Sequence, residues 1–112
     1  MQYSINMSNK VKSEFDRYVE YISKMDGVLR IYLYGSYAYG IPSQSSDIDI
    51  LVVVRDGINT LKLMQDISYG LHDRKIALDV VAENDSIFRE RSEPERVTLQ
   101  REVRDKGVLV YG

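Results

Sequence analysis

Two stretches of the chain repeat apolar residues at the three- and four-residue steps of an amphipathic helix. The first covers residues 8–25, with apolar positions at Val11, Phe15, Tyr18, Val19, Ile22 and Met25. The second covers residues 58–71, with apolar positions at Ile58, Leu61, Met64, Ile67 and Leu71. Ser8 is placed to cap the first helix, and Gly27 suits a left-handed turn after it.

Short runs rich in β-branched and aromatic residues, bounded by glycine or polar turns, predict strands. These runs cover residues 28–34, 47–54, 75–81 and 108–111. Further helices are expected at residues 36–39, within residues 83–91, and over residues 92–106. Ser92 would cap the last of these helices, and Gly107 would end it. The alternation predicts one α/β (α+β) domain over residues 1–112, with a small sheet of about four strands flanked by helices.

Composition narrows the classes of function. With 44% hydrophobic and 29% charged residues, the chain is expected to be soluble and globular. Its net charge of −2 gives no basic surface for holding nucleic acid. The absence of cysteine excludes disulfides, thiolate zinc sites and cysteine nucleophiles. Because the N-terminal segment lacks the apolar core of a signal peptide, and no apolar run approaches the ~20 residues of a membrane span, a cytoplasmic protein is expected.

One stretch joins a Gly-Ser pair to two aspartates. Gly35 and Ser36 follow the first predicted strand, and after ten further residues Asp47 and Asp49 open the second. Side chains alternate along a strand, so these two carboxylates would share a face about 7 Å apart, and pairing of strands can bring Asp79 beside them. Three carboxylates about 5 Å apart repel by roughly 3 kcal/mol per pair at an effective dielectric constant near 20. A bound cation would relieve this repulsion, and oxygen ligands favour Mg²⁺ or Mn²⁺.

The Gly-Ser pair adds a second kind of binding group. A glycine at a strand end lets the backbone approach a ligand closely, and Ser36 at a helix start offers a hydroxyl and exposed N–H donors. These groups suit the β- and γ-phosphates of a nucleoside triphosphate. Phosphates held here and a metal held by the aspartates would supply the parts needed for in-line displacement at phosphorus.

The Gly35-Ser36 pair, the ten-residue spacing, Asp47-Ile48-Asp49 and Asp79 together resemble the DNA-polymerase-β-type nucleotidyltransferase superfamily. The motif covers residues 35–79, and the short chain is similar to the minimal nucleotidyltransferases, many of which are antitoxins of HEPN-domain toxins. The resemblance implies a polymerase-β-like fold with a small mixed sheet.

The resemblance also implies a role for each matching residue. Asp47 and Asp49 would hold two Mg²⁺ ions, or Mn²⁺, around the triphosphate of ATP. Asp79 would complete the metal site and orient or deprotonate the acceptor hydroxyl, and Gly35 and Ser36 would hold the outgoing pyrophosphate. Many relatives carry arginine where Tyr39 stands, which leaves turnover open while metal and nucleotide binding are retained.

The implied activity is transfer of AMP from ATP to a hydroxyl, preferably a tyrosine of a HEPN-type partner toxin, so that the chain acts as an antitoxin. Two alternatives stay open. The chain could bind nucleotide without transferring it and neutralise its partner by contact alone, or it could modify a small molecule as aminoglycoside nucleotidyltransferases do. The base preference and homo-oligomerisation are also left open.

Other polar and aromatic residues have a structural and a functional interpretation. Packing is favoured over base stacking or nucleotide acceptance for Tyr32, Tyr34, Tyr37 and Tyr39. His72, near a helix end, is expected to be solvated and not catalytic. Alternating arginines and glutamates over residues 89–104 predict a solvated helix face with modest ion pairs, with a partner-binding face as the alternative.

Overall fold

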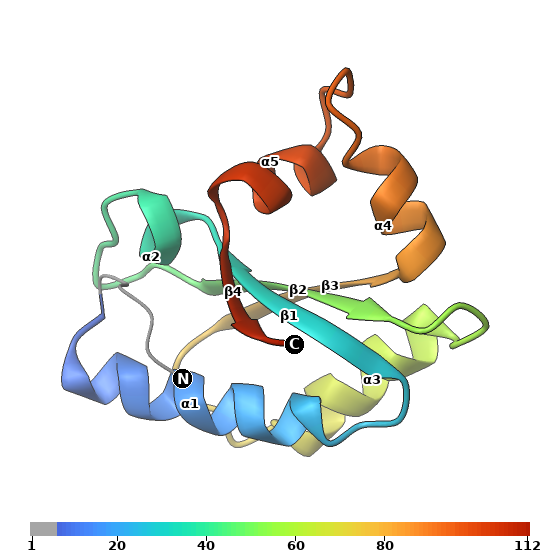
Figure 1. Ribbon diagram of the computed structural model, residues 1–112. Coiled ribbons are helices and arrows are strands. Elements are labelled where there is room, and N and C mark those ends of the chain that lie inside the picture. Colours follow the sequence, from blue (N-terminus) through green and yellow to red (C-terminus); the bar gives the residue numbers. More distant parts are fainter. Residues whose placement is uncertain (1–6) are drawn as a thin grey trace.

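A four-stranded mixed sheet with the strand order β3-β2-β1-β4 forms the centre of the structure (Figure 1). The computed structural model describes residues 7–112. Residues 1–6 belong to the N-terminal segment that is predicted not to be a signal peptide, and for these residues the prediction lies outside the described part of the chain. The strands are β1 (Val28–Tyr34), β2 (Ile48–Val54), β3 (Leu78–Asn84) and β4 (Val108–Tyr111). The helices are α1 (Asn9–Ser23), α2 (Ser36–Tyr39), α3 (Thr60–Gly70), α4 (Asp85–Arg91) and α5 (Leu99–Lys106).

Helices cover both faces of the sheet. β1 is antiparallel to both of its neighbours, β2 and β4, whereas β2 and β3 are parallel and are joined through α3. Helices α1 and α3 lie on one face, and α4 and α5 lie on the other (Figure 1). This mixed sheet between helices confirms the predicted α/β (α+β) class.

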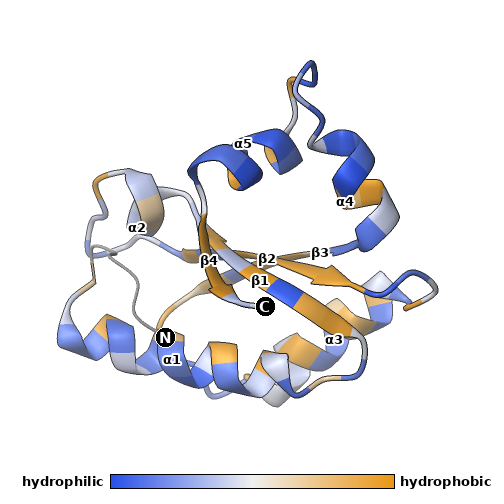
Figure 2. Cartoon of the chain, viewed as in Figure 1, coloured by the Kyte–Doolittle hydropathy of each residue, from blue (hydrophilic) through white to orange (hydrophobic). Residues whose placement is uncertain are grey.

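The alternation of side chains divides the apolar residues between two cores. Figure 2 shows hydrophobic strands between helices whose outer surfaces are hydrophilic. The larger core lies between the sheet and helices α1 and α3, and its fully buried members include Phe15, Tyr18, Ile22, Ile31, Leu33, Ile48, Ile50, Val52 and Val54. The smaller core lies under α4 and α5 and contains Tyr34, Leu51, Val53, Phe88 and Val103. The face with the smaller core carries the candidate site.

Several local predictions are confirmed. The Ser8 side chain accepts a hydrogen bond from the Val11 N–H and caps α1. The short helix α2 and the last strand β4 have the predicted bounds. Gly27 is left-handed, with φ +83°, but it lies in the turn before β1 because α1 already ends at Ser23. Among residues 7–112, no helix combines the length and the apolar character that crossing a bilayer requires.

The third strand lies three residues later than predicted, at Leu78–Asn84 and not at residues 75–81. The reason is a contact with α1. The Lys75 N–H donates to Glu14 Oε2 at 2.9 Å, and the Ile76 N–H donates to the Tyr18 hydroxyl at 3.2 Å. These two backbone groups therefore bond to helix side chains before the chain joins the sheet.

The predicted start of the last helix is wrong. α5 begins at Leu99, and its cap is Thr98, whose hydroxyl accepts from the Arg101 N–H at 3.1 Å. Ser92 is instead the residue that follows α4, where its N–H donates to the Phe88 carbonyl at 3.0 Å, and it is buried. A helix end and a turn therefore occupy the segment in which Ser92 was predicted to cap a helix.

The apolar face of α3 is also shifted from the prediction. Leu61 is 62% exposed, whereas Leu63 is 6% exposed and packs in the larger core with Ile67 and Leu71. The Asn59 side chain caps α3 by accepting from the Lys62 N–H at 3.0 Å. The buried leucines and isoleucine of this segment, Leu63, Ile67 and Leu71, therefore recur at every fourth position.

Candidate functional site

Strand pairing brings two of the three predicted aspartates together. Asp49 of β2 lies opposite Asp79 of β3 on one side and opposite Tyr34 of β1 on the other. Directly paired residues point to the same face of a sheet. Asp47 lies in the loop one residue before β2 and is exposed. The site thus lies at the start of β2, on the face that carries the smaller core.

The carboxylates act on one another electrostatically. Burial, followed by the negative charges of Asp79 and Asp47, raises the pKa of Asp49 to about 6. Burial likewise raises the pKa of Tyr34 to about 12, with Asp49 and Asp79 as the next causes. The charges that act on Asp49 in this way are all negative, so the site favours an incoming cation.

The donor set fits a hard divalent cation. Asp47, Asp49 and Asp79 offer only carboxylate oxygens, the ligands that Mg²⁺ and Mn²⁺ prefer. In the described part of the chain, however, no three His, Cys, Asp or Glu side chains are grouped so that they could hold a metal ion. The paired Asp49 and Asp79 are the residues best placed to hold a cation, and Asp47 could join them from the loop.

Gly35 brings the backbone directly against Asp49. Its φ is +74°, a left-handed conformation that glycine adopts without strain. A Cβ at this position would overlap Oδ2 of Asp49 and lie 3.2 Å from its Cγ. The Gly35 carbonyl accepts from the N–H groups of Ala38 and Tyr39, which starts α2 at Ser36, immediately after Gly35. Gly35, the first residue of the predicted Gly-Ser pair, therefore lies beside Asp49.

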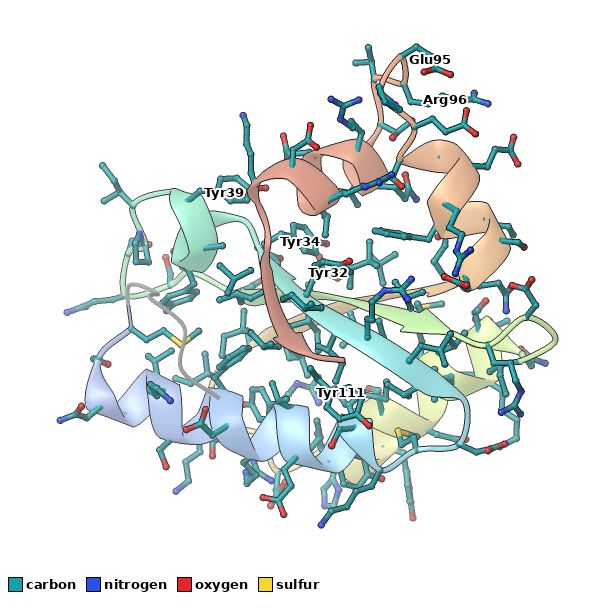
Figure 3. The ribbon with its side chains drawn as sticks, in the orientation of Figure 1. Tyr32, Tyr34, Tyr39, Glu95, Arg96 and Tyr111 are labelled. Atoms are coloured by element: carbon teal, nitrogen blue, oxygen red, sulfur yellow. The ribbon has the colours of Figure 1, made fainter. Side chains whose placement is uncertain are left out.

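Helix α5 adds a residue that sequence reasoning did not place at the site. The Tyr39 hydroxyl donates to Glu102 Oε2 at 2.7 Å, across 63 positions of sequence. Burial raises the pKa of Tyr39, and its hydrogen bond to Glu102 raises it further. In Figure 3, Tyr39 lies between α2 and α5, and Tyr34 lies beneath α5. The sequence showed Glu102 only as one charge in an alternating pattern, and no local signal could have revealed this contact.

The remaining aromatic predictions are largely confirmed. Tyr34 and Tyr37 are buried, and Tyr32 stacks on Phe88 with ring centroids 5.5 Å apart. Tyr39 is the exception, at 41% exposed. His72 is exposed in the turn after α3, with its Nδ1 2.9 Å from the Tyr69 carbonyl oxygen. Helix α3 covers the face of the sheet opposite the smaller core and the aspartates (Figure 1).

The mixed charges after residue 85 also behave as predicted. Ion pairs join Arg89 to Asp85, Arg96 to Glu90, and Arg101 to Asp105. The charged side chains of the first two pairs are exposed, apart from Asp85. Such pairs contribute little to stability, as expected of a solvated helix face.

Comparison with known proteins agrees with this geometry. The family model described as "Polymerase beta, Nucleotidyltransferase" matches residues 16–112. A candidate nucleotidyltransferase from Sulfolobus solfataricus has a TM-score of 0.57 and 20% identity, over 93% of this chain and 87% of that one. A toxin–antitoxin structure with AMP-PNP has a TM-score of 0.53 and 22% identity, over 90% and 73% of the two chains.

At these identities the two structures show a shared fold. Comparison with curated proteins gives no match. The family match is broader, because it covers the Gly-Ser pair, all three aspartates and every strand of the sheet. The chain therefore belongs to the polymerase β nucleotidyltransferase family.

Proposed function

We propose that the chain transfers AMP from ATP to a hydroxyl acceptor, namely a tyrosine of a HEPN-type partner toxin, and so acts as an antitoxin in the cytoplasm. The observation that carries the proposal is the pairing of Asp49 with Asp79 beside the left-handed Gly35. The acceptor class is supported by the similarity to a toxin–antitoxin structure with AMP-PNP.

Each residue has a role in this proposal. Asp49 and Asp79, together with Asp47, would hold Mg²⁺, which would supply positive charge against the charge that develops on the triphosphate. Gly35 lets the phosphates approach the backbone, and Ser36 donates its hydroxyl to them. Asp79 accepts the proton of the acceptor hydroxyl. The acceptor oxygen then bonds to the α-phosphorus, the bond from that phosphorus to the β-phosphate oxygen breaks, and pyrophosphate leaves.

The direct test follows the α-phosphate. The chain, co-expressed with its partner and supplied with Mg²⁺ and α-³²P-ATP, is expected to label the partner. Asp49→Asn should abolish labelling because it removes the carboxylate that lies opposite Asp79 and against Gly35. Asp66→Asn is the control, because it makes the same chemical change on α3, where Asp66 pairs with Lys62 on the exposed surface. This variant should label the partner as fully as the unchanged chain does. Absence of label on the partner with the unchanged chain would contradict the proposal.

A second assay separates catalysis from steric neutralisation. If contact alone protects cells, Asp49→Asn will protect as well as the unchanged chain, and the catalytic proposal is wrong. If transfer protects cells, Asp49→Asn will bind the partner and fail to protect.

Nucleotide binding is tested without any partner. A ligand that binds only the folded state stabilises it by about 2.7 kcal/mol at a hundred times its Kd. Millimolar ATP with Mg²⁺ is therefore expected to raise the Tm of the chain, and Asp49→Asn should reduce this shift. A Tm that does not respond to Mg²⁺ and ATP would exclude the proposed nucleotide site.

A further inference from the structure

Arg30 is a charged residue in the middle of an apolar strand, and the proposed function does not use it. It lies on β1, which has a neighbouring strand on each side. Its side chain is only 26% exposed, and its Nη2 donates to Asp85 Oδ1 at 2.6 Å. Arg30 lies four residues from Tyr34, or about 13 Å along the strand. It is therefore on the face of the aspartates but well separated from them.

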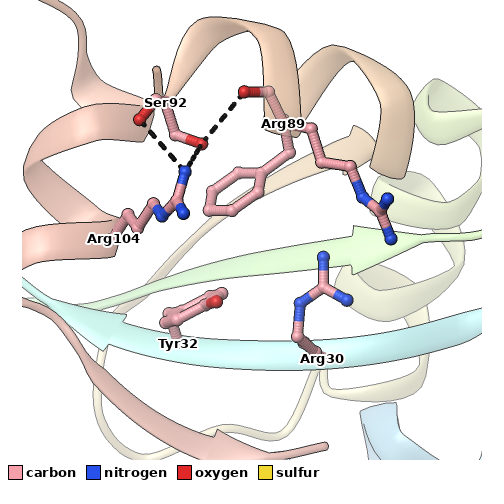
Figure 4. A pocket seen from close by; sticks show the side chains of 6 residues that line it. Arg30, Tyr32, Arg89, Ser92 and Arg104 are labelled. Atoms are coloured by element: carbon pink, nitrogen blue, oxygen red, sulfur yellow. Dashed lines mark hydrogen bonds between the residues drawn. The ribbon is translucent and has the colours of Figure 1, made fainter. Parts of the chain in front are cut away.

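Arg30 forms part of a pocket of about 470 Å³, a volume within the usual range for small-molecule sites of about 300–1,000 Å³. The pocket lies between the sheet, α4 and α5, and is lined by Arg30, Tyr32, Phe88, Arg89, Ser92 and Arg104. In Figure 4, Arg104 and Ser92 lie on one side, Arg30 and Arg89 lie on the other, and Tyr32 lies between them.

The lining carries a net positive charge. Asp85 pairs with both Arg30 and Arg89, at 2.6 and 3.1 Å. Arg104 has no carboxylate within ion-pair distance among residues 7–112, and its Nη1 makes only long hydrogen bonds to the Ser92 carbonyl oxygen and Oγ, at 3.4 and 3.5 Å. Three guanidinium groups and one carboxylate leave a charge of +2. A phosphate monoester at pH 7 carries about −1.5 to −2, which matches this charge.

The floor of the pocket suits the organic part of such a ligand. Tyr32 and Phe88 stack with an interplanar angle of 24°. Both rings line the pocket, with Tyr32 partly buried and Phe88 almost fully buried. A phosphate held by guanidinium groups and a flat body packed on these rings would use both features of the pocket.

Helix α5 separates this pocket from the candidate transfer site. Successive residues of a helix point about 100° apart. Val103 is buried against the sheet, Glu102 bonds Tyr39 of α2, and Arg104 bonds Ser92 at the end of α4. The two sites therefore lie on opposite sides of α5.

We propose that the pocket lined by Arg30, Arg89, Arg104, Ser92, Tyr32 and Phe88 is a second binding site, separate from the transfer site, for a phosphate monoester with a planar organic group. The guanidinium group of Arg104 donates to the phosphate. Arg30 and Arg89 add positive charge, and the rings of Tyr32 and Phe88 pack against the organic group.

The test is an NMR titration of the ¹⁵N-labelled full chain at low ionic strength, without Mg²⁺ or nucleotide. The probes are inorganic phosphate, phenyl phosphate and benzoate. Phenyl phosphate is expected to shift the resonances of residues 88–92 and 103–105 saturably, and to bind more tightly than inorganic phosphate because its ring packs on the floor. Binding of benzoate as tightly as phenyl phosphate would point to a carboxylate ligand, such as an acidic protein segment, and overturn the proposal.

Charge-matched variants test the assignment. Arg104→Gln is expected to weaken phenyl phosphate binding about tenfold or more, the range for losing a hydrogen bond to a charged group. Arg104→Lys keeps the charge, so its affinity for phenyl phosphate should lie between those of the unchanged chain and Arg104→Gln. Arg96→Gln is the control, because Arg96 pairs with Glu90 outside the pocket, and should bind as the unchanged chain does. Equal weakening by Arg104→Gln and Arg96→Gln would show a general charge effect and refute the site.

A last variant keeps this proposal independent of the proposed function. Asp49→Asn removes a carboxylate of the transfer site and should leave phenyl phosphate binding unchanged. If Asp49→Asn instead strengthens binding severalfold, the probe occupies the transfer site, where the variant removes a repelling carboxylate, and the second site does not exist. Failure of nucleotidyl transfer would not affect these results, since neither ATP nor metal is present.

Discussion

Glu14 joins α1 to the segment that leads into β3, and its contribution to stability can be worked out from its contacts. The carboxylate accepts hydrogen bonds from Arg17 Nε and Nη2, both at 3.1 Å, from the Tyr18 hydroxyl at 3.0 Å, and from the Lys75 N–H at 2.9 Å. Glu14 is buried, with 8% of its surface exposed. Four residues after Lys75, the chain reaches Asp79 of the candidate site, so this network also fixes the start of the strand that carries it.

These contacts lower the pKa of Glu14 from 4.5 to about 2, with the hydrogen bonds from Arg17 as the largest cause and that from Lys75 as the next. One pKa unit is worth about 1.4 kcal/mol, so the charged form contributes about 3 kcal/mol to the free energy of unfolding. Because the pKa is lower in the folded state, the unfolded chain binds more protons between pH 4.5 and 2. The contribution is therefore complete above pH 4.5 and is lost as the pH falls towards 2.

Glu14→Gln is expected to lower the free energy of unfolding by about 2–3 kcal/mol at pH 7, since a neutral amide cannot accept all four bonds. Glu20→Gln on the same helix is the control. Glu20 pairs with Lys24, and both side chains are at least 70% exposed, so its loss should change stability by no more than about 0.5 kcal/mol.

Urea unfolding followed by circular dichroism, at several pH values from 7 to 2.5, measures both effects. The difference between the unchanged chain and Glu14→Gln should shrink as the pH falls below 4.5. The reasoning is refuted if this difference is the same at every pH, or if Glu14→Gln and Glu20→Gln have equal effects at pH 7.

Two further predictions concern the site and the core. Gly35→Ala combines a left-handed φ with overlap against Asp49, so it should cost more than the about 1–2 kcal/mol expected for Gly57→Ala, whose φ is +96° in open space. Equal losses of unfolding free energy in urea would contradict the overlap. Ile50→Ala in the fully buried core should cost about 2–5 kcal/mol. Ile41→Ala, at a residue that is 94% exposed, should cost less than about 0.5 kcal/mol in thermal unfolding, and a large loss there would be inconsistent with its exposure.

The sequence by itself determined the order and type of most elements, because these depend on local periodicity and turn chemistry. Ser8 caps α1 through an oxygen three residues from its donor, and the four-residue helix after Gly35 requires only its own backbone bonds. The spacing of Asp47 and Asp49 after the Gly-Ser pair likewise identified the candidate site without any structure.

The predicted boundaries of helices and strands were wrong where residues distant in sequence contact the segment. The start of β3 was misplaced because Glu14 and Tyr18 of α1 bond the N–H groups of Lys75 and Ile76. Ser92 looked like a helix cap in sequence, but packing under α4 and α5 buries it at a helix end instead. Local propensity cannot include contacts that form only when the chain folds.

The candidate site, too, was determined partly by the sequence and partly by the tertiary structure. The sequence determined which carboxylates could act together, but the register of β2 and β3 decided that Asp49 lies opposite Asp79 while Asp47 remains in the loop. Only the placement of α5 brought Glu102 to Tyr39 and Arg104 to Ser92. The physical reason is that strand register and helix docking are set by burial of the two apolar cores, whose residues come from every part of the chain.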